Sequence, residues 1–220
     1  LHARSLRVPT AVTADLPPPA SDESPQTCRR CALWAQATQA VIGAGPTPAA
    51  IMLVGEQPGD EEDRRGEPFI GPAGTLLTRA LLQAGLAREQ VFITNAVKHF
   101  KWQARGKRRL HKTPAQQEIA ACEVWLEREL AQVRPRVIVS LGATAYRALT
   151  GQERGYAEAR RSQTLARDGI ALVVTWHPSA ALRVPNVEMR RAIFDDIVAA
   201  LKLAVERAGG TAAQAAAPPP

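Results

Sequence analysis

Three cysteines have a spacing that suits metal chemistry. Cys28 and Cys31 form a Cys-x-x-Cys pair, and Cys122 lies far along the chain. Three thiols are an awkward number for a disulfide framework, and in a reducing cytosol this pattern is more typical of a metal or cluster site. The sequence therefore indicates thiolate ligands rather than disulfide bonds.

A basic segment lies in the middle of a chain whose formal net charge is +7. Seven cations fall between positions 98 and 112: Lys98, Lys101, Arg105, Lys107, Arg108, Arg109 and Lys112. Such clusters are typical of proteins that bind a phosphate backbone, although charge alone fits a solvated loop equally well. His111 lies in the same segment, and a histidine in a basic loop is by itself more often a phosphate contact than a catalyst.

Glycine, proline and carboxylate residues follow the first strongly apolar run. The segment is Gly55-Glu56-Gln57-Pro58-Gly59-Asp60, and Phe69 follows between turn-forming residues. Glycines let a backbone approach a ligand closely, and proline stiffens the turn. An ordinary turn and a core phenylalanine explain the same residues, but an exposed ring beside a pocket could instead stack on a nucleobase.

Four short apolar runs predict buried parallel strands, at residues 51–54, 91–94, 137–141 and 171–175. Helical patterns separate and follow them, at residues 74–84, 114–132, 144–149 and 187–208. Pro114 suits the first turn of its helix, with Thr113 as the N-cap. This alternation predicts an α/β fold with three layers, α/β/α, around a central four-stranded parallel sheet.

The polar residues follow the carboxyl ends of these strands. The segments concerned are residues 55–60, Asn95 with the basic segment, residues 142–144, and Trp176-His177-Pro178-Ser179. In open parallel sheets the ligand site lies beyond the carboxyl ends of the strands. We therefore expect the site at this edge, and a helix-cap or surface role for His177 becomes the less favoured alternative.

The composition predicts one domain with tails. Residues 1–27 contain a proline run at 17–19 and are expected to be a flexible tail, residues 28–208 a single domain, and residues 209–220 a disordered tail. No stretch approaches the roughly 18 apolar residues of a membrane span, and no secretory leader is recognised. We expect a cytoplasmic protein acting at the nucleoid; the start at Leu1 is compatible with a missing upstream segment.

Four motifs, in order along the chain, resemble the uracil-DNA glycosylase superfamily. They are residues 55–60, the pattern Gly-x-Pro-Phe-x-Gly-Pro-Ala-Gly at 66–74, Thr94-Asn95-x-Val97-Lys98, and His177-Pro178-Ser179. The similarity is strongest to the iron–sulfur family 4 enzymes and extends from about residue 28 to residue 204. It implies a protein that excises uracil from DNA.

The resemblance assigns roles that are chemically reasonable. Phe69 would stack on the flipped uracil, Asn95 would bind its polar edge, and His177 would donate to the uracil oxygen as charge develops there. Backbone around Gln57 would close the pocket, and Ser179 would complete the substrate-binding set.

The same resemblance implies a [4Fe–4S] cluster with a structural role. Family 4 enzymes have a cysteine where this chain has His99, so the expected ligands are Cys28, Cys31, His99 and Cys122. The alternatives are a zinc site with the same four ligands and a three-cysteine cluster with His99 free.

The segment from His99 to Pro114 is longer than in family 4 and resembles the insertion of UdgX-type proteins, which become covalently joined to the abasic sugar. Their Lys-Arg-Arg-Ile-His motif reads Lys-Arg-Arg-Leu-His here, ending at His111. A nucleophilic histidine must be neutral, and neighbouring cations disfavour its protonation. We expect Glu56 to orient His111 and accept its proton, with Asp60 as the alternative. The DNA-binding residues are expected to be Lys107, Arg108, Arg109 and Lys112.

The sequence therefore predicts an enzyme that excises uracil and retains the abasic sugar carbon C1′ on His111. The alternatives are a multiple-turnover family 4 glycosylase, in which His111 only positions DNA, and a non-catalytic module that binds damaged DNA. The expected partner is uracil-containing DNA, single-stranded and double-stranded, with no membrane association and a monomeric protein.

Overall fold

The computed structural model describes residues 4–6, 23–163 and 165–209. Most of the two predicted tails, 1–27 and 209–220, lies outside the described residues, apart from strand β1 (Arg4–Leu6), residues 23–27 and Gly209. Within the described ranges, no helix has the length and apolarity that a membrane crossing requires.

The central sheet contains the four predicted parallel strands. In sheet order they are β8 (Ile170–Thr175), β6 (Val137–Leu141), β2 (Ile51–Gly55) and β3 (Phe92–Asn95). Beyond β8, the short strand β7 (Leu165–Arg167) pairs antiparallel, and β1 pairs parallel with β7. The predicted α/β fold is confirmed, and two short strands extend the predicted four-stranded sheet at one edge.

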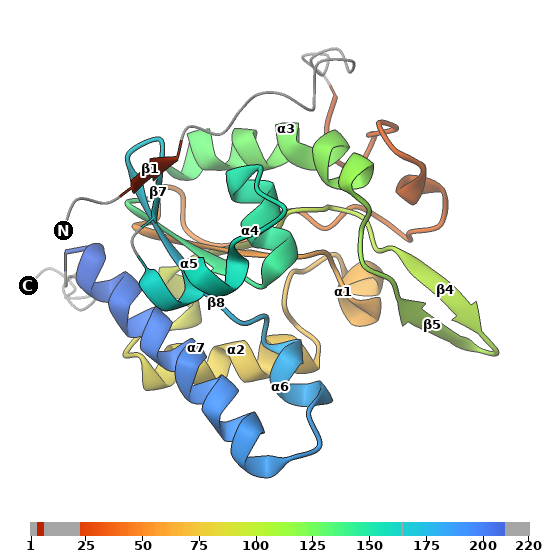
Figure 1. Cartoon of the computed structure of the whole chain (residues 1–220). Helices are drawn as coiled ribbons and strands as arrows, with labels where there is room; N and C mark the ends of the chain where they lie inside the picture. The colour runs from red at the N-terminus through yellow and green to blue at the C-terminus, as the bar shows by residue number, and fades with distance from the viewer. Residues whose placement is uncertain (1–3, 7–22, 164, 210–220) are drawn as a thin grey trace, which may run out of the picture.

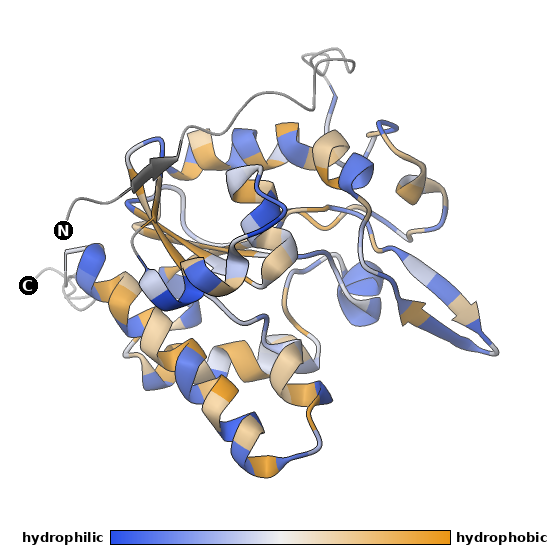
Figure 2. Ribbon diagram, in the orientation of Figure 1, coloured by the Kyte–Doolittle hydropathy of each residue, from blue (hydrophilic) through white to orange (hydrophobic). Residues whose placement is uncertain are grey.

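Helices cover both faces of this sheet because alternate strand residues point to opposite sides. On one face Ile51 and Leu53 pack with α2 (Pro72–Gln83), α6 (Ser179–Arg183) and α7 (Val187–Arg207). On the other, Met52 and Val54 pack with α3 (Gln116–Val133), α4 (Ala143–Thr150) and α5 (Tyr156–Ser162). Figure 1 shows these three layers, and in Figure 2 the enclosed strands are the hydrophobic centre.

The start of α3 differs from the prediction. The helix begins at Gln116 with Ala115 as its N-cap, so Thr113 is not the cap and Pro114 is not in the first turn. The reason is the Glu118 carboxylate, which accepts a hydrogen bond from the Ala115 amide at 2.6 Å and fixes the first turn there.

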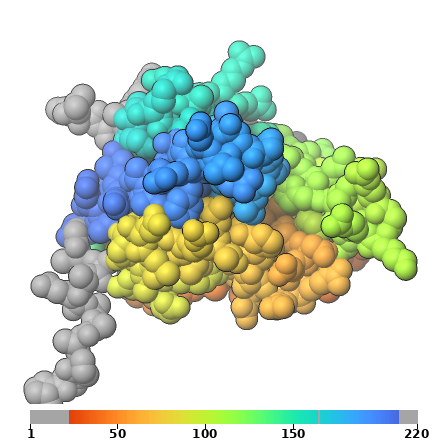
Figure 3. Space-filling model, turned by 90° about the horizontal axis from the view of Figure 1, so that it is seen from below, coloured from red at the N-terminus to blue at the C-terminus, as the bar shows by residue number. Residues whose placement is uncertain are grey.

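The basic segment forms a β-hairpin where the sequence predicted a loop. Strands β4 (Trp102–Arg105) and β5 (Arg108–His111) pair antiparallel, with Trp102 opposite His111. Gly106 has φ +59°, which suits the first residue of a tight two-residue turn. The hairpin projects from the body of the molecule, beside the unpredicted helix α1 (Asp60–Arg65) (Figures 1 and 3). Two short 3-10 helices, η1 (Ala32–Ala35) and η2 (Arg88–Gln90), complete the described elements.

Candidate active site

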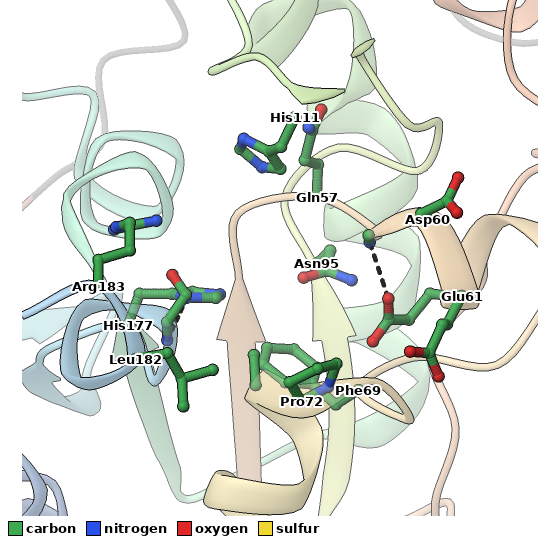
Figure 4. A pocket seen from close by; sticks show the side chains of 14 residues that line it. Gln57, Asp60, Glu61, Phe69, Pro72, Asn95, His111, His177, Leu182 and Arg183 are labelled. Atoms are coloured by element: carbon green, nitrogen blue, oxygen red, sulfur yellow. Dashed lines mark hydrogen bonds between the residues drawn. The ribbon is translucent and has the colours of Figure 1, made fainter. Parts of the chain in front are cut away.

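A cavity of about 300 Å³ opens at the carboxyl edge of the sheet. Seven of the residues predicted for the site line it together: Gln57, Asp60, Phe69, Asn95, His111, His177 and Ser179. Figure 4 shows Asn95 and Phe69 on one side, His177 on another and His111 at the hairpin end. The cavity lies where parallel strands end, because Asn95 is the last residue of β3 and His177 follows β8.

Asn95 presents an unused hydrogen-bond acceptor to this cavity. Its side chain is buried, with 2% of the residue exposed, and among the described residues Oδ1 has no hydrogen-bond partner. A Cβ atom at Gly55 would lie 2.4 Å from Asn95 Oδ1 and 2.5 Å from Phe69 Cζ. Glycine at position 55 therefore allows the amide and the ring to come together. A buried acceptor without a partner is costly unless a ligand supplies the donor.

Phe69 serves both the core and the cavity. It belongs to the hydrophobic cluster under α2 and α7, and its ring also lines the cavity. The ring centroid lies 5.7 Å from that of His177, and the two planes are inclined by 34°. Its backbone has φ +55°, a left-handed conformation that is uncommon for an aromatic residue. A core phenylalanine and a stacking platform are thus compatible descriptions of this residue.

His177 is held as a neutral hydrogen-bond donor. Burial lowers its pKa to about 4, and the nearby Glu56 charge does not offset this effect. The Ser179 amide donates to Nδ1 at 3.2 Å, and the Ser179 hydroxyl lies 2.8 Å from the same nitrogen. Because Nδ1 accepts, the single proton of the neutral ring resides on Nε2. Ser179 lines the cavity, but its hydrogen bonds orient His177.

Glu56 is the carboxylate that contacts His111. Nε2 of His111 lies 3.2 Å from Glu56 Oε1, and the Thr144 hydroxyl donates to the other oxygen. Burial raises the pKa of Glu56, but the hydrogen bonds from His111 and Thr144 outweigh burial and lower the pKa overall. The alternative carboxylate, Asp60, pairs instead with Arg109 and Arg64. The His111 side chain is 44% exposed, so large partners can reach it.

Gln57 holds the base of the hairpin with its side chain. Its Nε2 donates to the carbonyl oxygens of Lys101 and Lys112, both at 3.1 Å, and its Oε1 accepts from the Lys101 amide at 3.0 Å. The sequence-based prediction gave only its backbone a part, in closing the pocket, and missed the side-chain role. Only the folded hairpin reveals that role, because the partners lie 44 and 55 residues away.

The four predicted DNA-binding cations differ in their surroundings. Lys107, Arg108 and Lys112 are exposed. Arg109, however, pairs with Asp60 and, at 2.6 Å, with Asp63 of α1. Burial lowers the pKa of Arg109, but the hydrogen bonds to Asp63 and Asp60 outweigh burial and raise it. Arg109 therefore has protein partners that fasten the hairpin to α1.

The predicted cysteine ligands share one apolar region. Cys28 and Cys122 are buried with Val97, Ile119 and Trp125, and Cys31 packs against them. Trp125 Nε1 donates to Cys28 Sγ at 3.3 Å, and the Lys98 amide donates to Cys122 Sγ at 3.4 Å. Buried sulfurs with N–H donors are the surroundings in which iron–sulfur clusters are held. The cysteines therefore fit such a cluster chemically.

The four expected ligands do not, however, converge. In the part of the chain that the structure describes, no three His, Cys, Asp or Glu side chains are arranged to hold a metal ion. Burial raises the pKa of the Cys122 thiol to about 12, and an uncharged thiol packs like a small apolar group. Burial also favours the uncharged form of the fourth expected ligand, His99. It lowers the pKa of this histidine, so the ring is neutral.

The protein has an α/β fold in which a ring, an amide and a neutral imidazole line a small cavity, and an exposed basic hairpin adjoins it. A family model described as the uracil DNA glycosylase superfamily matches residues 42–202. The chain belongs to this superfamily.

The curated relatives include enzymes of two types. The chain is 37% identical over 176 residues to a type-4 uracil-DNA glycosylase from Thermotoga maritima, covering 80% of this chain and 88% of the relative. A type-4 enzyme from Sulfurisphaera tokodaii is 35% identical over 187 residues, 81% of each chain. A type-5 enzyme from Pyrobaculum aerophilum is 29% identical over 197 residues, 82% of each. The predicted superfamily and the similarity to family 4 are confirmed. The names of these relatives do not show the predicted resemblance to UdgX-type proteins.

Proposed function

We propose that this protein excises uracil from DNA. The single observation that carries the proposal is the unpartnered Oδ1 of Asn95 beside the Phe69 ring. Uracil has a flat ring for stacking and an N3–H donor flanked by two carbonyl acceptors. Asn95 Oδ1 would accept from N3–H, and the Nε2–H of His177 would donate to a carbonyl oxygen. The names of the type-4 relatives describe the same activity.

The proposed reaction breaks the bond between the sugar C1′ and uracil N1. The bonding electrons leave with uracil, which becomes an anion, and the sugar becomes an oxocarbenium ion. A neutral donor held at the uracil oxygen is in position before charge develops, so it stabilises the transition state without reorganisation. Donors of this kind contribute about 3–4 kcal/mol in other enzymes. His177, oriented by Ser179, supports this role.

We further propose that His111 captures the sugar. It lines the same cavity as Asn95 and His177, and Glu56 engages its Nε2. The lone pair of Nδ1 would form a bond to C1′, and the resulting imidazolium would lose its Nε2 proton through Glu56. The product is a neutral N-alkyl imidazole, which is a poor leaving group. The relatives' names describe glycosylases and mention no adduct, so they favour the alternative of hydrolysis with multiple turnover.

A structural [4Fe–4S] cluster is the proposed cofactor, by the family 4 resemblance. Cys28, Cys31 and Cys122 would hold it, with His99 as fourth ligand. The support is the shared apolar region and the N–H donors to two of the sulfurs. Thiolate coordination would tie separate segments together and add stability.

A denaturing gel distinguishes the proposals. The protein is mixed with an end-labelled oligonucleotide containing one uracil, with a thymine-containing oligonucleotide as the control. A band that stays shifted in denaturant supports capture by the protein, and alkali-cleavable DNA in excess over enzyme supports turnover. DNA that remains uncleaved by alkali and unshifted leaves only the damaged-DNA binding module.

His111→Ser is the matched variant for the capture step. We expect it to lose the shifted band and to keep uracil release, because water then reaches C1′. Persistence of the band in this variant would remove His111 from the mechanism while leaving excision intact.

A further inference from the structure

The carboxylate of Glu62 is buried against backbone amides of two separate segments. Its residue is 7% exposed, and it lies in α1 at the wall of the cavity. Oε2 accepts from the Gly59 amide at 3.0 Å. Oε1 accepts from the amides of Ile70 and Gly71, at 3.1 and 2.9 Å. One carboxylate thus joins the segment after β2 to the segment after Phe69.

Glycines leave the room that this carboxylate occupies. A Cβ atom at Gly59 would lie 2.5 Å from Glu62 Oε2, and one at Gly71 would lie 3.2 Å from Oε1. Neither position has a left-handed backbone, since φ is −89° at Gly59 and −77° at Gly71. Glycine at these positions therefore leaves the carboxylate room for close approach, and the backbone conformation does not call for it. The two motif glycines and Glu62 form one unit.

Phe69 lies between this unit and a second contact. Arg88 of η2 donates from Nη2 to the carbonyl oxygen of Pro68, on the other side of Phe69. Helix α2 also approaches closely, because a Cβ atom at Gly74 would lie 1.8 Å from the Phe69 carbonyl oxygen. A left-handed backbone at a phenylalanine persists only where its surroundings impose it. Glu62 and Arg88 supply that restraint through the residues on either side.

We propose that Glu62 and Arg88 are positioning residues that hold the Phe69 ring in place for the base. Neither needs to touch the substrate, and the inference rests on the proposed function because the base is the group that the ring would meet. A carboxylate suits the task because both of its oxygens accept hydrogen bonds. An amide of the same size would turn an N–H₂ group toward one of the three amide donors and break the link.

Glu62→Gln tests the link with little change in size. Three quantities are measured: the single-turnover rate of uracil release, inhibition by free uracil, and the dissociation constant for an undamaged oligonucleotide of the same length. We expect the rate to fall about tenfold to a hundredfold, as small misplacements of reacting groups do elsewhere. Inhibition by free uracil should weaken about tenfold for the same reason. Binding of undamaged DNA should not change, because the basic hairpin is untouched.

Arg88→Met tests the other side of Phe69 and is expected to shift the rate and uracil inhibition in the same direction. Asn186→Ala is the matched control, since it removes a comparable cap at α7, where Asn186 Oδ1 accepts a hydrogen bond from the Met189 amide. It should lower the melting temperature and leave the rate unchanged.

The outcomes are distinct. If both variants release uracil at the wild-type rate with unchanged uracil inhibition, Glu62 and Arg88 are only structural and this inference is wrong, while the proposed function stands. If Glu62→Gln does not fold, the rate of uracil release and the uracil inhibition of Arg88→Met decide whether the inference holds. If wild-type protein releases no uracil, the proposed function fails, and this inference fails with it.

Discussion

The site depends on two titratable side chains whose surroundings shift their pKa values below the ordinary range. Burial keeps His177 uncharged at neutral pH, whereas hydrogen bonds keep Glu56 ionised despite burial. Thr144 and His111 supply those hydrogen bonds. Because its pKa is lowered, Glu56 is better suited to stabilise a cationic ring as a carboxylate than to keep a proton taken from that ring. After capture by His111, the proton would therefore pass through Glu56 to water.

The low pKa of His177 predicts a loss of stability in acid. Its pKa is about 4 in the folded protein and close to 6.5 in an unfolded chain, so the unfolded state binds more protons between these values. The free energy of unfolding should therefore fall as pH decreases from 6.5 toward 4, by at most about 3 kcal/mol from this residue. Above pH 6.5 the residue should contribute no pH dependence.

Denaturant unfolding of wild-type protein and His177→Gln, measured between pH 7.5 and pH 4.5, checks this expectation. The variant retains every carboxylate, so the difference between the two curves isolates His177. That difference should shift in favour of the variant as pH decreases. Parallel curves would contradict a lowered pKa at His177.

At the scale of elements, the β4–β5 hairpin is fastened at three places. Gln57 holds its base, Arg109 pairs with α1, and Trp102 Nε1 donates to the carbonyl oxygen of Gln36 at 3.0 Å. The Arg109 guanidinium also lies 5.5 Å from the centre of the Trp102 ring. The tip remains exposed, with Lys107 and Arg108 at its surface. The hairpin thus combines a fixed base, which positions His111, with a cationic tip.

This division predicts different effects for neighbouring cations. Replacing Lys107 and Arg108 by Ala should weaken binding to undamaged single-stranded DNA. The slope of log affinity against log salt should become shallower by about 0.7 for each phosphate that is no longer neutralised. Arg109→Ala should leave that slope unchanged. It should instead lower the free energy of unfolding by about 3 kcal/mol, because Asp63 is left buried without its cation.

Salt titrations of DNA binding and denaturant unfolding of the two variants measure both effects. A reduced salt slope in Arg109→Ala would show that this guanidinium meets phosphate, and would restore it to the set of DNA-binding residues.

At the scale of the whole molecule, the cysteine region connects segments that are far apart in sequence. Cys28 and Cys31 precede β2, His99 follows β3, and Cys122 lies in α3. The apolar cluster around them is distinct from the clusters on the two faces of the sheet, and its buried members are not among the residues that line the cavity. A cofactor held there would therefore contribute to stability and not to the chemistry in the cavity.

Protein purified without oxygen should be brown and contain about four iron atoms, the number in a [4Fe–4S] cluster. Cys28→Ser and Cys122→Ser should lose the visible absorption and the iron, and their melting temperatures should fall. His99→Ala should lower the iron content as well. Full iron content in His99→Ala would exclude it as a ligand, and zinc in place of iron would exclude the cluster.

Sequence patterns were sufficient wherever burial alone determines structure. Continuous apolar runs located all four strands of the parallel sheet to within about one residue. Because the carboxyl ends of parallel strands share one edge, the same runs located Asn95 and His177 near each other. The hairpin was missed because its strands are mostly exposed and carry no apolar alternation, although the Gly106-Lys107 pair is a turn signal.

What the amino-acid sequence determined by itself was the layering of the fold and the edge at which the chemistry lies, since local hydrophobicity is a property of short segments. The choice among chemically equivalent partners required the tertiary structure. Glu56 rather than Asp60 contacts His111, and Arg109 meets Asp63 across 46 residues of chain. Such pairings depend on where α1 and the hairpin pack in three dimensions. A hydrogen bond tolerates only a few tenths of an ångström in its donor–acceptor distance, so its partner is decided by how the elements pack. No short-range sequence pattern encodes that packing.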